Sequence, residues 1–154
     1  MDVEFLLYKP GEIDVESLES FLKEADDYVI PSLRTLVNIS DYAKKIAEKA
    51  TLFVALDGFK IVGISATYVN KAPSFSYGTY LCVLKPYQDD MIGIDLILKS
   101  INYCKEYGSA SYRGEIRKAN KVLWNFYKRL GFVAIEESVY PNSDVSSLII
   151  ELKY

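Results

Sequence analysis

The chain has 154 residues, of which 50% are apolar and 25% charged, so it is long and apolar enough to fold around one core. We expect residues 1–154 to form a single domain. A net charge of −3 without a Lys/Arg stripe argues against nucleic acid or an anionic membrane as the main partner. The sequence contains no histidine, which excludes His-assisted hydrolases and most His-ligated metal sites.

The start of the chain lacks a basic stretch followed by an apolar run, and no segment of about 18 apolar residues occurs, so we expect a cytoplasmic protein. Cys82 and Cys104 are far apart within apolar segments. They are interpreted as core residues, with no disulfide and no bound metal. Tyrosine, acidic groups, lysine and the backbone remain for chemistry. A homodimer stays open at this stage.

In the first third of the chain, apolar spacing predicts a strand at 3–9 and a short helix at 18–25. Residues 26–38 contain a proline and mixed polar residues, and are expected to form a loop. A second helix is predicted to begin after Ser40 as its N-cap and to run to Ala50.

The middle of the chain reads as three strands and a helix. The segments 51–56 and 60–69 flank Asp57-Gly58, a sequence typical of a tight hairpin turn. A long strand at 75–84 ends before Pro86. Helical spacing then begins at Ile92 and is expected to stop at Gly108, a left-handed cap.

The last third predicts a strand at 111–117 and a helix whose apolar stripe runs from Leu123 to Leu130. Two further strands are expected at 132–137 and 145–152. The full order is β-α-α-β-β-β-α-β-α-β-β.

The helical crossover that follows residue 84 predicts one parallel strand pair inside an otherwise antiparallel sheet. The fold class is therefore mixed α+β, with a twisted sheet of about seven strands and four helices. Because ligands favour the carboxyl ends of strands where a crossover begins, the turn at 85–93 is the first place to look for a site.

Two stretches resemble the motifs of one family. Residues 81–94, LCVLKPYQDDMIGI, are similar to the acetyl-CoA motif of GNAT acetyltransferases, in which a strand runs into Q/R-x-x-G-x-G/A and a helix. Residues 120–132, NKVLWNFYKRLGF, are similar to the family's N-x-x-A-x-x-F/L-Y-x-K-x-G-F signature. The resemblance covers roughly residues 51–137. It implies a GNAT-like sheet with helices on both faces and the parallel pair at the cofactor cleft.

The resemblance implies acetyl-CoA as cofactor, with its pyrophosphate on the backbone of the turn and the start of the following helix. Its pantetheine arm would pair with the strand at 75–84 as an added strand. Asn120 would tie the next helix to the cofactor side; a plain N-cap is the alternative. The cofactor-binding residues so implied are Cys82, Val83, Leu84, Gln88, Asp89, Asp90, Met91, Ile92, Gly93, Ile94, Asn120 and Tyr127.

On the same likeness, Tyr127 would protonate the departing thiolate while a neutral amine attacks the thioester directly. The alternative is a tyrosine packed on the helix's apolar stripe. Tyr80 and Glu115 are candidates for a general base. Each could instead be a solvent-exposed strand residue, with a water chain taking the proton.

The acceptor amine is expected near the loop from Tyr28 to Asn38 and the strand pair around Tyr68 and Tyr77. Arg34 could bind an acidic group of the substrate, or simply be solvated. The 13 tyrosines suggest an aromatic-lined cleft, although many would be sheet-face residues.

The expected function is therefore N-acetylation of a primary amine on a small molecule, an aminosugar or a protein. Met91 stands where the motif's first glycine allows close backbone approach, and Asp89 and Asp90 place carboxylates in the same turn. These departures favour a second hypothesis, a GNAT-fold acyl-CoA sensor or partner-binding module with weakened catalysis. A third is an unrelated α+β binding domain with an accidental motif match.

Overall fold

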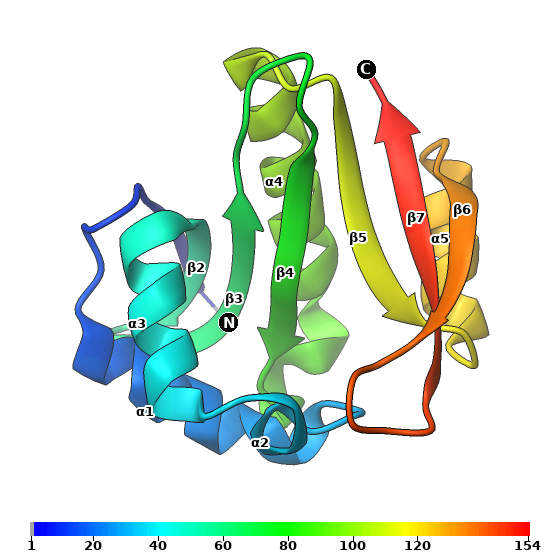
Figure 1. Cartoon of the computed structure of the whole chain (residues 1–154). Helices are drawn as coiled ribbons and strands as arrows, with labels where there is room; N and C mark the ends of the chain where they lie inside the picture. Colours follow the sequence, from blue (N-terminus) through cyan, green and yellow to red (C-terminus); the bar gives the residue numbers. More distant parts are fainter. Residues whose placement is uncertain (1) are drawn as a thin grey trace.

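A computed structural model describes residues 2–154, apart from the side chain of Asp89. Within this part of the chain one sheet has seven strands in the order β1-β2-β3-β4-β5-β7-β6 (Figure 1). All neighbours are antiparallel except β4 and β5, which are parallel. The strands are β1 Glu4–Tyr8, β2 Thr51–Asp57, β3 Lys60–Tyr68, β4 Ser76–Val83, β5 Ser111–Arg117, β6 Val133–Val139 and β7 Ser146–Lys153.

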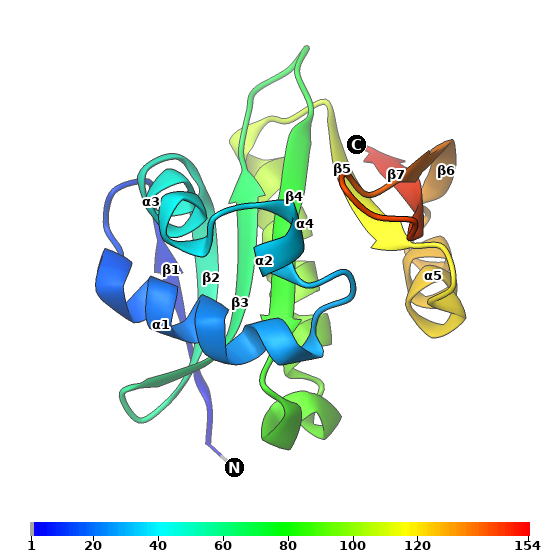
Figure 2. The ribbon, with the colours of Figure 1, turned by 60° about the horizontal axis from the view of Figure 1, so that its bottom comes forward.

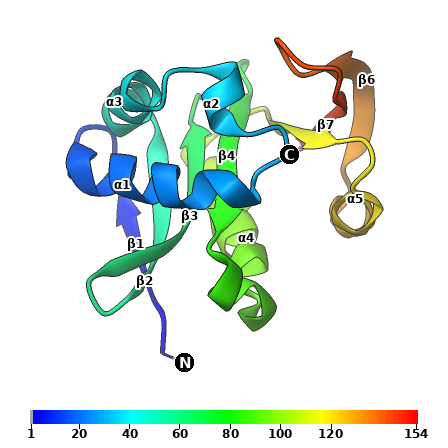
Figure 3. The same ribbon diagram turned by 90° about the horizontal axis from the view of Figure 1, so that it is seen from below.

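Helices cover both faces of the sheet. Helices α1 to α3 lie on one face, and α4 and α5 lie on the other (Figure 3). None of the helices in residues 2–154 is long and apolar enough to cross a membrane. The helices are α1 Val15–Ala25, α2 Leu33–Leu36, α3 Ile39–Lys49, α4 Ile92–Tyr107 and α5 Lys121–Arg129, with 3-10 helices at Asp26–Tyr28 and Lys85–Asp90.

The predicted fold class, the seven strands and the parallel pair are confirmed. Two details of the prediction are wrong, and the turn expected after β4 takes the form of a 3-10 helix. The segment expected to be a loop contains α2, because Asp26 organises it through hydrogen bonds described below. Helix α3 begins after Asn38 rather than Ser40, since the Asn38 side chain accepts from the N–H of Asp41 at 3.0 Å.

The core consists of two apolar clusters separated by the line between β4 and β5. One cluster joins α1 and α3 to β2, β3 and β4, with Leu22, Ile46 and Ile64 fully buried. The other joins α5 to β5, β7 and the middle of α4, and includes Tyr112 and Ile150. Helix α4 contributes residues to both clusters and Leu81 of β4 packs against both, so these elements join the two sides of the parallel pair.

The parallel pair is short, and this decides where the site lies. Strands β4 and β5 pair only from Ser76–Tyr112 to Gly78–Gly114. Beyond these residues the strands diverge, as Figures 1 and 2 show. The chain around α2 and the connection between β6 and β7 lie at the divergent end (Figure 1). A wedge-shaped opening in the sheet is the result.

A bulge in β4 sits at the point of divergence. The register of β4 on β3 shifts between Ala66, opposite Tyr80, and Thr67, opposite Gly78, so Thr79 is an extra residue with no partner. Bulges bend a strand and redirect its side chains, which here turns β4 away from β5.

Candidate active site

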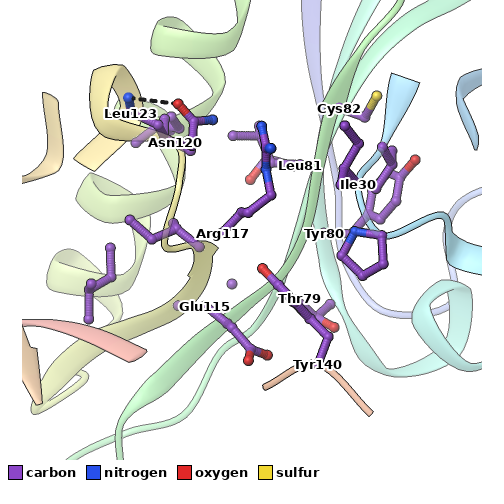
Figure 4. Close-up of a pocket in the computed structure, with 18 of the residues that line it drawn as sticks. Ile30, Thr79, Tyr80, Leu81, Cys82, Glu115, Arg117, Asn120, Leu123 and Tyr140 are labelled. Carbon is purple, nitrogen blue, oxygen red and sulfur yellow. Dashed lines mark hydrogen bonds between the residues drawn. The ribbon is translucent and has the colours of Figure 1, made fainter. Parts of the chain in front are cut away.

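The divergence of β4 and β5 opens a cavity of about 320 Å³. Its walls are both diverging strands, the start of α5 with its preceding turn, the 28–36 segment and Tyr140 of the β6–β7 connection (Figure 4). In Figure 4, Arg117 and Asn120 lie on one side of β4, and Tyr80 and Cys82 on the other. The site thus runs through the sheet from one face to the other.

The free edge of β4 supplies main-chain groups to this cavity. Leu84 donates its N–H to Val62 of β3 at 2.8 Å, and alternation along an antiparallel pair gives Cys82 and Tyr80 the same direction. The N–H and C=O groups of Leu81 and Val83 therefore point to the opening. Of the residues predicted for the cofactor at the end of β4, Val83 has this orientation. The main chain of Cys82 and the N–H of Leu84, the residue after β4, face β3.

The start of α4 adjoins this edge. Met91 has a left-handed backbone, with φ 59° and ψ 14°, and no side chain caps the helix. The first N–H groups of a helix lack intrahelical acceptors, so those of Ile92, Gly93 and Ile94 are available to a ligand. A Cβ placed on Gly93 would meet only Val83, at 3.7 Å. An anion could approach this helix start closely.

The preceding 3-10 helix is fastened at two points. The Tyr87 hydroxyl donates to Asp57 of β2 at 2.6 Å, and the Gln88 amide donates to the carbonyl of Val83 at 2.9 Å. Gln88 thus engages the main-chain acceptor at the end of β4. Asp90 is exposed, and the side chain of Asp89 lies outside the described part of the chain.

Glu115 is the first residue of β5 past the last pair with β4. It lines the cavity and is only partly exposed, and its carboxylate accepts a hydrogen bond from the Ser147 hydroxyl at 2.5 Å. One hydrogen bond leaves most of the carboxylate's acceptor capacity unused.

Tyr80, the other predicted base, is not solvent-exposed. It packs beside Tyr42, 6.4 Å between ring centroids, and its buried hydroxyl finds no hydrogen-bond partner in residues 2–154. Burial, followed by the neighbouring Cys82, raises the pKa of Tyr80 far above its usual range. A phenol in this setting is a poor proton acceptor.

Tyr127 lies on α5 and lines the cavity, although only 8% of its surface is exposed. Its ring packs edge-on against Phe132 at 4.9 Å and Phe126 at 5.7 Å. Burial, with a smaller contribution from Tyr112, raises the pKa of Tyr127 well above its usual range. A packed tyrosine and a tyrosine at the site were the two alternatives for this residue. The Tyr127 side chain is packed and also lines the cavity, so the two alternatives do not exclude each other.

Asn120 serves as the N-cap of α5, accepting from the N–H of Leu123 at 3.2 Å, and it also lines the cavity. Between Asn120 and Leu81 lies the side chain of Arg117 (Figure 4). Arg117 forms no ion pair with any acidic residue whose side chain is described. Sequence patterns did not identify Arg117, because a single arginine at a strand end carries no signal of its own.

Of the residues predicted for the acceptor, Tyr28 and Tyr77 line the cavity. Burial, and then the charge of Glu115, raises the pKa of Tyr77 to about 12. Tyr68 and Arg34 do not line it. Tyr68 lies beneath the Lys45 ammonium, 5.6 Å from its ring centre.

Arg34 stabilises the loop instead. Its guanidinium lies 3.0 Å from the carboxylate of Asp26 and 3.5 Å from that of Asp27. Asp26 is fully buried and also accepts hydrogen bonds from the N–H groups of Leu33 and Arg34. These bonds satisfy a buried charge and fix α2 at the rim of the cavity.

Two further residues of the cavity were not identified from the sequence. Thr79, the bulge residue, is held by the Tyr42 hydroxyl of α3, 2.8 Å from its own hydroxyl. Tyr140 reaches the cavity from the β6–β7 connection. Both positions depend on contacts between segments distant in sequence, for which a single sequence offers no periodic signal.

Comparison with known proteins gives a family match and fold neighbours. The family model for the acetyltransferase (GNAT) domain matches residues 24–143. No curated protein matches the chain. Among solved structures, the ribosomal-protein-S18-alanine N-acetyltransferase from Escherichia coli is 16% identical, with a TM-score of 0.75 over 97% of this chain and 94% of that one.

Two archaeal structures are similar to the same extent. PaiA N-acetyltransferase from Thermoplasma acidophilum, in complex with coenzyme A, is 16% identical, with a TM-score of 0.70 over 100% of both chains. Ard1 from Thermoplasma volcanium is 17% identical, with a TM-score of 0.74 over 97% of both. At these levels of sequence identity, the similarity shows a shared fold and no more. Because the family match spans most of the sequence, the chain belongs to the GNAT acetyltransferase family.

Proposed function

We propose that the protein is an N-acetyltransferase that moves an acetyl group from acetyl-CoA to a primary amine by direct attack. The observation that carries the proposal is the opening between β4 and β5, where an unpaired strand edge, Glu115 and Tyr127 meet in one cavity, with the uncapped start of α4 adjoining the end of β4. This proposal rests on family membership for the reaction type and on the cavity for the residues.

The cavity and the adjoining start of α4 offer groups that fit acetyl-CoA. The N–H groups of Ile92, Gly93 and Ile94 would hold the pyrophosphate, and the main chain of Leu81 and Val83 would pair with the amide-bearing arm. Arg117 adds a cation to the same side of the cavity as Asn120 (Figure 4). Bound acetyl-CoA supplies a thioester carbonyl that accepts the amine, and a thiolate that leaves.

Glu115 is the proposed base. Primary amines are protonated at neutral pH, so a proton must leave the nitrogen before it can form a bond to the acetyl carbon. The Glu115 carboxylate accepts that proton, directly or through a water, and the Ser147 hydroxyl keeps the carboxylate oriented. Tyr80 is the weaker candidate, because its hydroxyl is buried and keeps its proton.

Tyr127 is the proposed acid. As the carbon–nitrogen bond forms and the carbon–sulfur bond breaks, the electron pair stays on sulfur, which needs a proton. Burial keeps the Tyr127 hydroxyl protonated across the neutral range, which is the state a proton donor requires. The nitrogen gives up two protons over one turnover. The first passes through Glu115 to solvent, and the second, lost once the carbon–nitrogen bond has formed, restores the proton that Tyr127 gave to sulfur.

Two observations favour a second function. Gln88 already occupies the carbonyl of Val83, and Met91 rather than glycine takes the left-handed position before α4. Both features suit a module that binds acyl-CoA weakly and serves as a sensor or partner-binding domain. The cytoplasmic location, the expectation of neither a nucleic-acid nor a membrane partner, and a homodimer stay predictions.

Thiol release from acetyl-CoA with a panel of amines tests the transferase. We expect turnover in the wild type and a loss of about 10²- to 10⁴-fold in kcat for Glu115→Gln and for Tyr127→Phe, the usual contribution of a general acid or base. Tyr107→Phe, a partly exposed tyrosine outside the cavity, is the matched control. A melting temperature that rises with acetyl-CoA, without thiol release for any amine, would instead support the second function.

A further inference from the structure

The part of the cavity that would receive the acceptor is walled by apolar and phenolic side chains. The 28–36 segment presents its apolar residues and one tyrosine, and further tyrosines come from β4 and from the β6–β7 connection. The apolar residues are Val29, Ile30, Pro31, Leu33 and Leu36, and the tyrosines are Tyr28, Tyr77 and Tyr140.

Charge in the cavity is divided between two residues. Among the described residues that line it, Glu115 and Arg117 are the charged ones. Figure 4 shows them pointing in opposite directions, with Arg117 toward Leu81 and Asn120, and the Glu115 carboxylate on the side of Tyr140. The negative charge of Glu115 also acts on Tyr77 and Tyr140. The pKa values of both tyrosines are raised, first by burial and then by this carboxylate. The acceptor side therefore carries a carboxylate, and the cation belongs to the cofactor side.

The cation of the 28–36 segment is not available to a substrate. Arg34 belongs to the loop that forms the apolar wall, but its guanidinium is held by Asp26 and Asp27. Withdrawing it would leave the fully buried charge of Asp26 without its ion pair, which is strongly unfavourable. No lysine among the described residues lines the cavity.

We propose that the acceptor is a cationic primary amine on an apolar body with no carboxylate or phosphate, such as an arylalkylamine or a branched alkylamine. This inference rests on the proposed transferase function. Its ammonium group would be held by Glu115 and the faces of the surrounding tyrosines, and its body by Ile30, Pro31 and Leu36. A substrate carboxylate would lie beside Glu115 or against apolar side chains, with no cation to offset its desolvation.

Matched pairs of ligands test this inference. Each pair shares a body and an amine and differs by one carboxylate: 2-phenylethylamine with phenylalanine, and 3-methylbutylamine with leucine. Binding to the full chain is measured by calorimetry, with and without coenzyme A. We expect each amine to bind at least about tenfold more tightly than its amino acid, a difference of about 1.4 kcal/mol.

Variants separate the role of the carboxylate from general effects. Glu115→Gln should weaken binding of both amines, because the neutral amide keeps the shape but not the charge. Glu137→Gln, which removes an exposed carboxylate outside the cavity, should leave binding unchanged. Equal or tighter binding of the amino acids, or no binding of either amine at about 10 mM, a range that covers even weak ligands, would overturn the inference.

The same experiment distinguishes this inference from the proposed function. Amines that bind preferentially without thiol release would support the acceptor class and contradict the transferase. Thiol release that prefers phenylalanine or leucine would support the transferase and overturn the acceptor class. The comparison on the wild-type protein holds even where Glu115→Gln fails to fold.

Discussion

The hydroxyl of Tyr42 lies 2.8 Å from the hydroxyl of Thr79, and through this contact α3 holds the bulge at which β4 leaves β5. The hydrogen bond links a helix on one face of the sheet to the point where the cavity opens. The shape of the site therefore depends on a residue outside the cavity.

Replacing Tyr42 by phenylalanine should lower kcat clearly but lower the free energy of unfolding only slightly. The ring can keep its packing beside Tyr80, so the free energy of unfolding should fall by about 1 kcal/mol, the net worth of one hydrogen bond. Denaturant unfolding and thiol release measure the two effects. Tyr103→Phe, which loses no hydrogen bond in the described structure, is the control. An unchanged kcat would show that the bulge holds its position without Tyr42.

Gly78 should not tolerate a side chain. A Cβ at this position would lie 2.3 Å from the hydroxyl of Tyr112, which is buried and cannot move freely. Gly78→Ala should therefore destabilise the fold by about 1–3 kcal/mol, as overpacking does. At Gly114, the partner of Gly78 on β5, the nearest atom would be 3.9 Å away, so Gly114→Ala should have a small effect.

Adding Tyr112→Phe to Gly78→Ala should restore much of the lost stability, since it removes the hydroxyl that the new methyl group meets. Denaturant unfolding of the two single variants and the double variant gives the comparison. Equal stability of Gly78→Ala and Gly114→Ala would contradict the packing described for Tyr112.

At position 91, glycine should give a more stable protein than alanine. In an ordinary helical position alanine is more stable than glycine by about 1 kcal/mol, but a left-handed backbone costs a residue with a Cβ about 1–2 kcal/mol. Met91→Gly should thus be more stable than Met91→Ala, the reverse of the helical order. Thermal melting of both variants checks this; alanine as the more stable of the two would be inconsistent with the left-handed turn before α4.

Glu151 should make stability depend on pH. It is buried, and the pKa of its carboxyl is held below its usual range first by the Arg113 guanidinium at 2.7 Å and also by the Ser111 hydroxyl. A carboxyl whose pKa is lower in the folded state stabilises above its unfolded pKa of about 4.3, and this is lost as the pH falls through the folded value.

The gap in unfolding free energy between the wild type and Glu151→Gln should therefore be largest near neutral pH, at about 1–3 kcal/mol, and shrink in acid. Glu136→Gln, an exposed residue on β6, should show almost no gap at any pH. A gap for Glu151→Gln that is constant from neutral pH into acid would refute the ion pair.

The parts of the fold that follow local rules could be predicted from the sequence. The hairpin was predicted from the Asp57-Gly58 turn, the end of α4 from Gly108, and the parallel pair from the crossover after Leu84. The family match also removes the hypothesis of an unrelated fold with an accidental motif.

The remaining features depend on contacts between distant segments. The bulge at Thr79 follows from the register of β4 on β3, and no pattern within β4 encodes it. Arg34 looked available to a substrate because the burial of Asp26, eight positions away, is a tertiary property. Tyr127 was identified through the resemblance and Glu115 as a candidate base on its strand, and the structure adds that they share a cavity.

In the proposed function, the start of α4 beside the free edge of β4 binds the diphosphate of acetyl-CoA. Calorimetric titration of the wild type and Gly93→Asp tests this claim. The new carboxylate has room beside Val83 and should favour the helix start by about 0.3–1 kcal/mol, so the variant should melt no lower than the wild type. Yet it should repel the diphosphate, and we predict that acetyl-CoA binds the wild type and binds the stable variant at least about tenfold more weakly. Equal affinity for both proteins would contradict the claim.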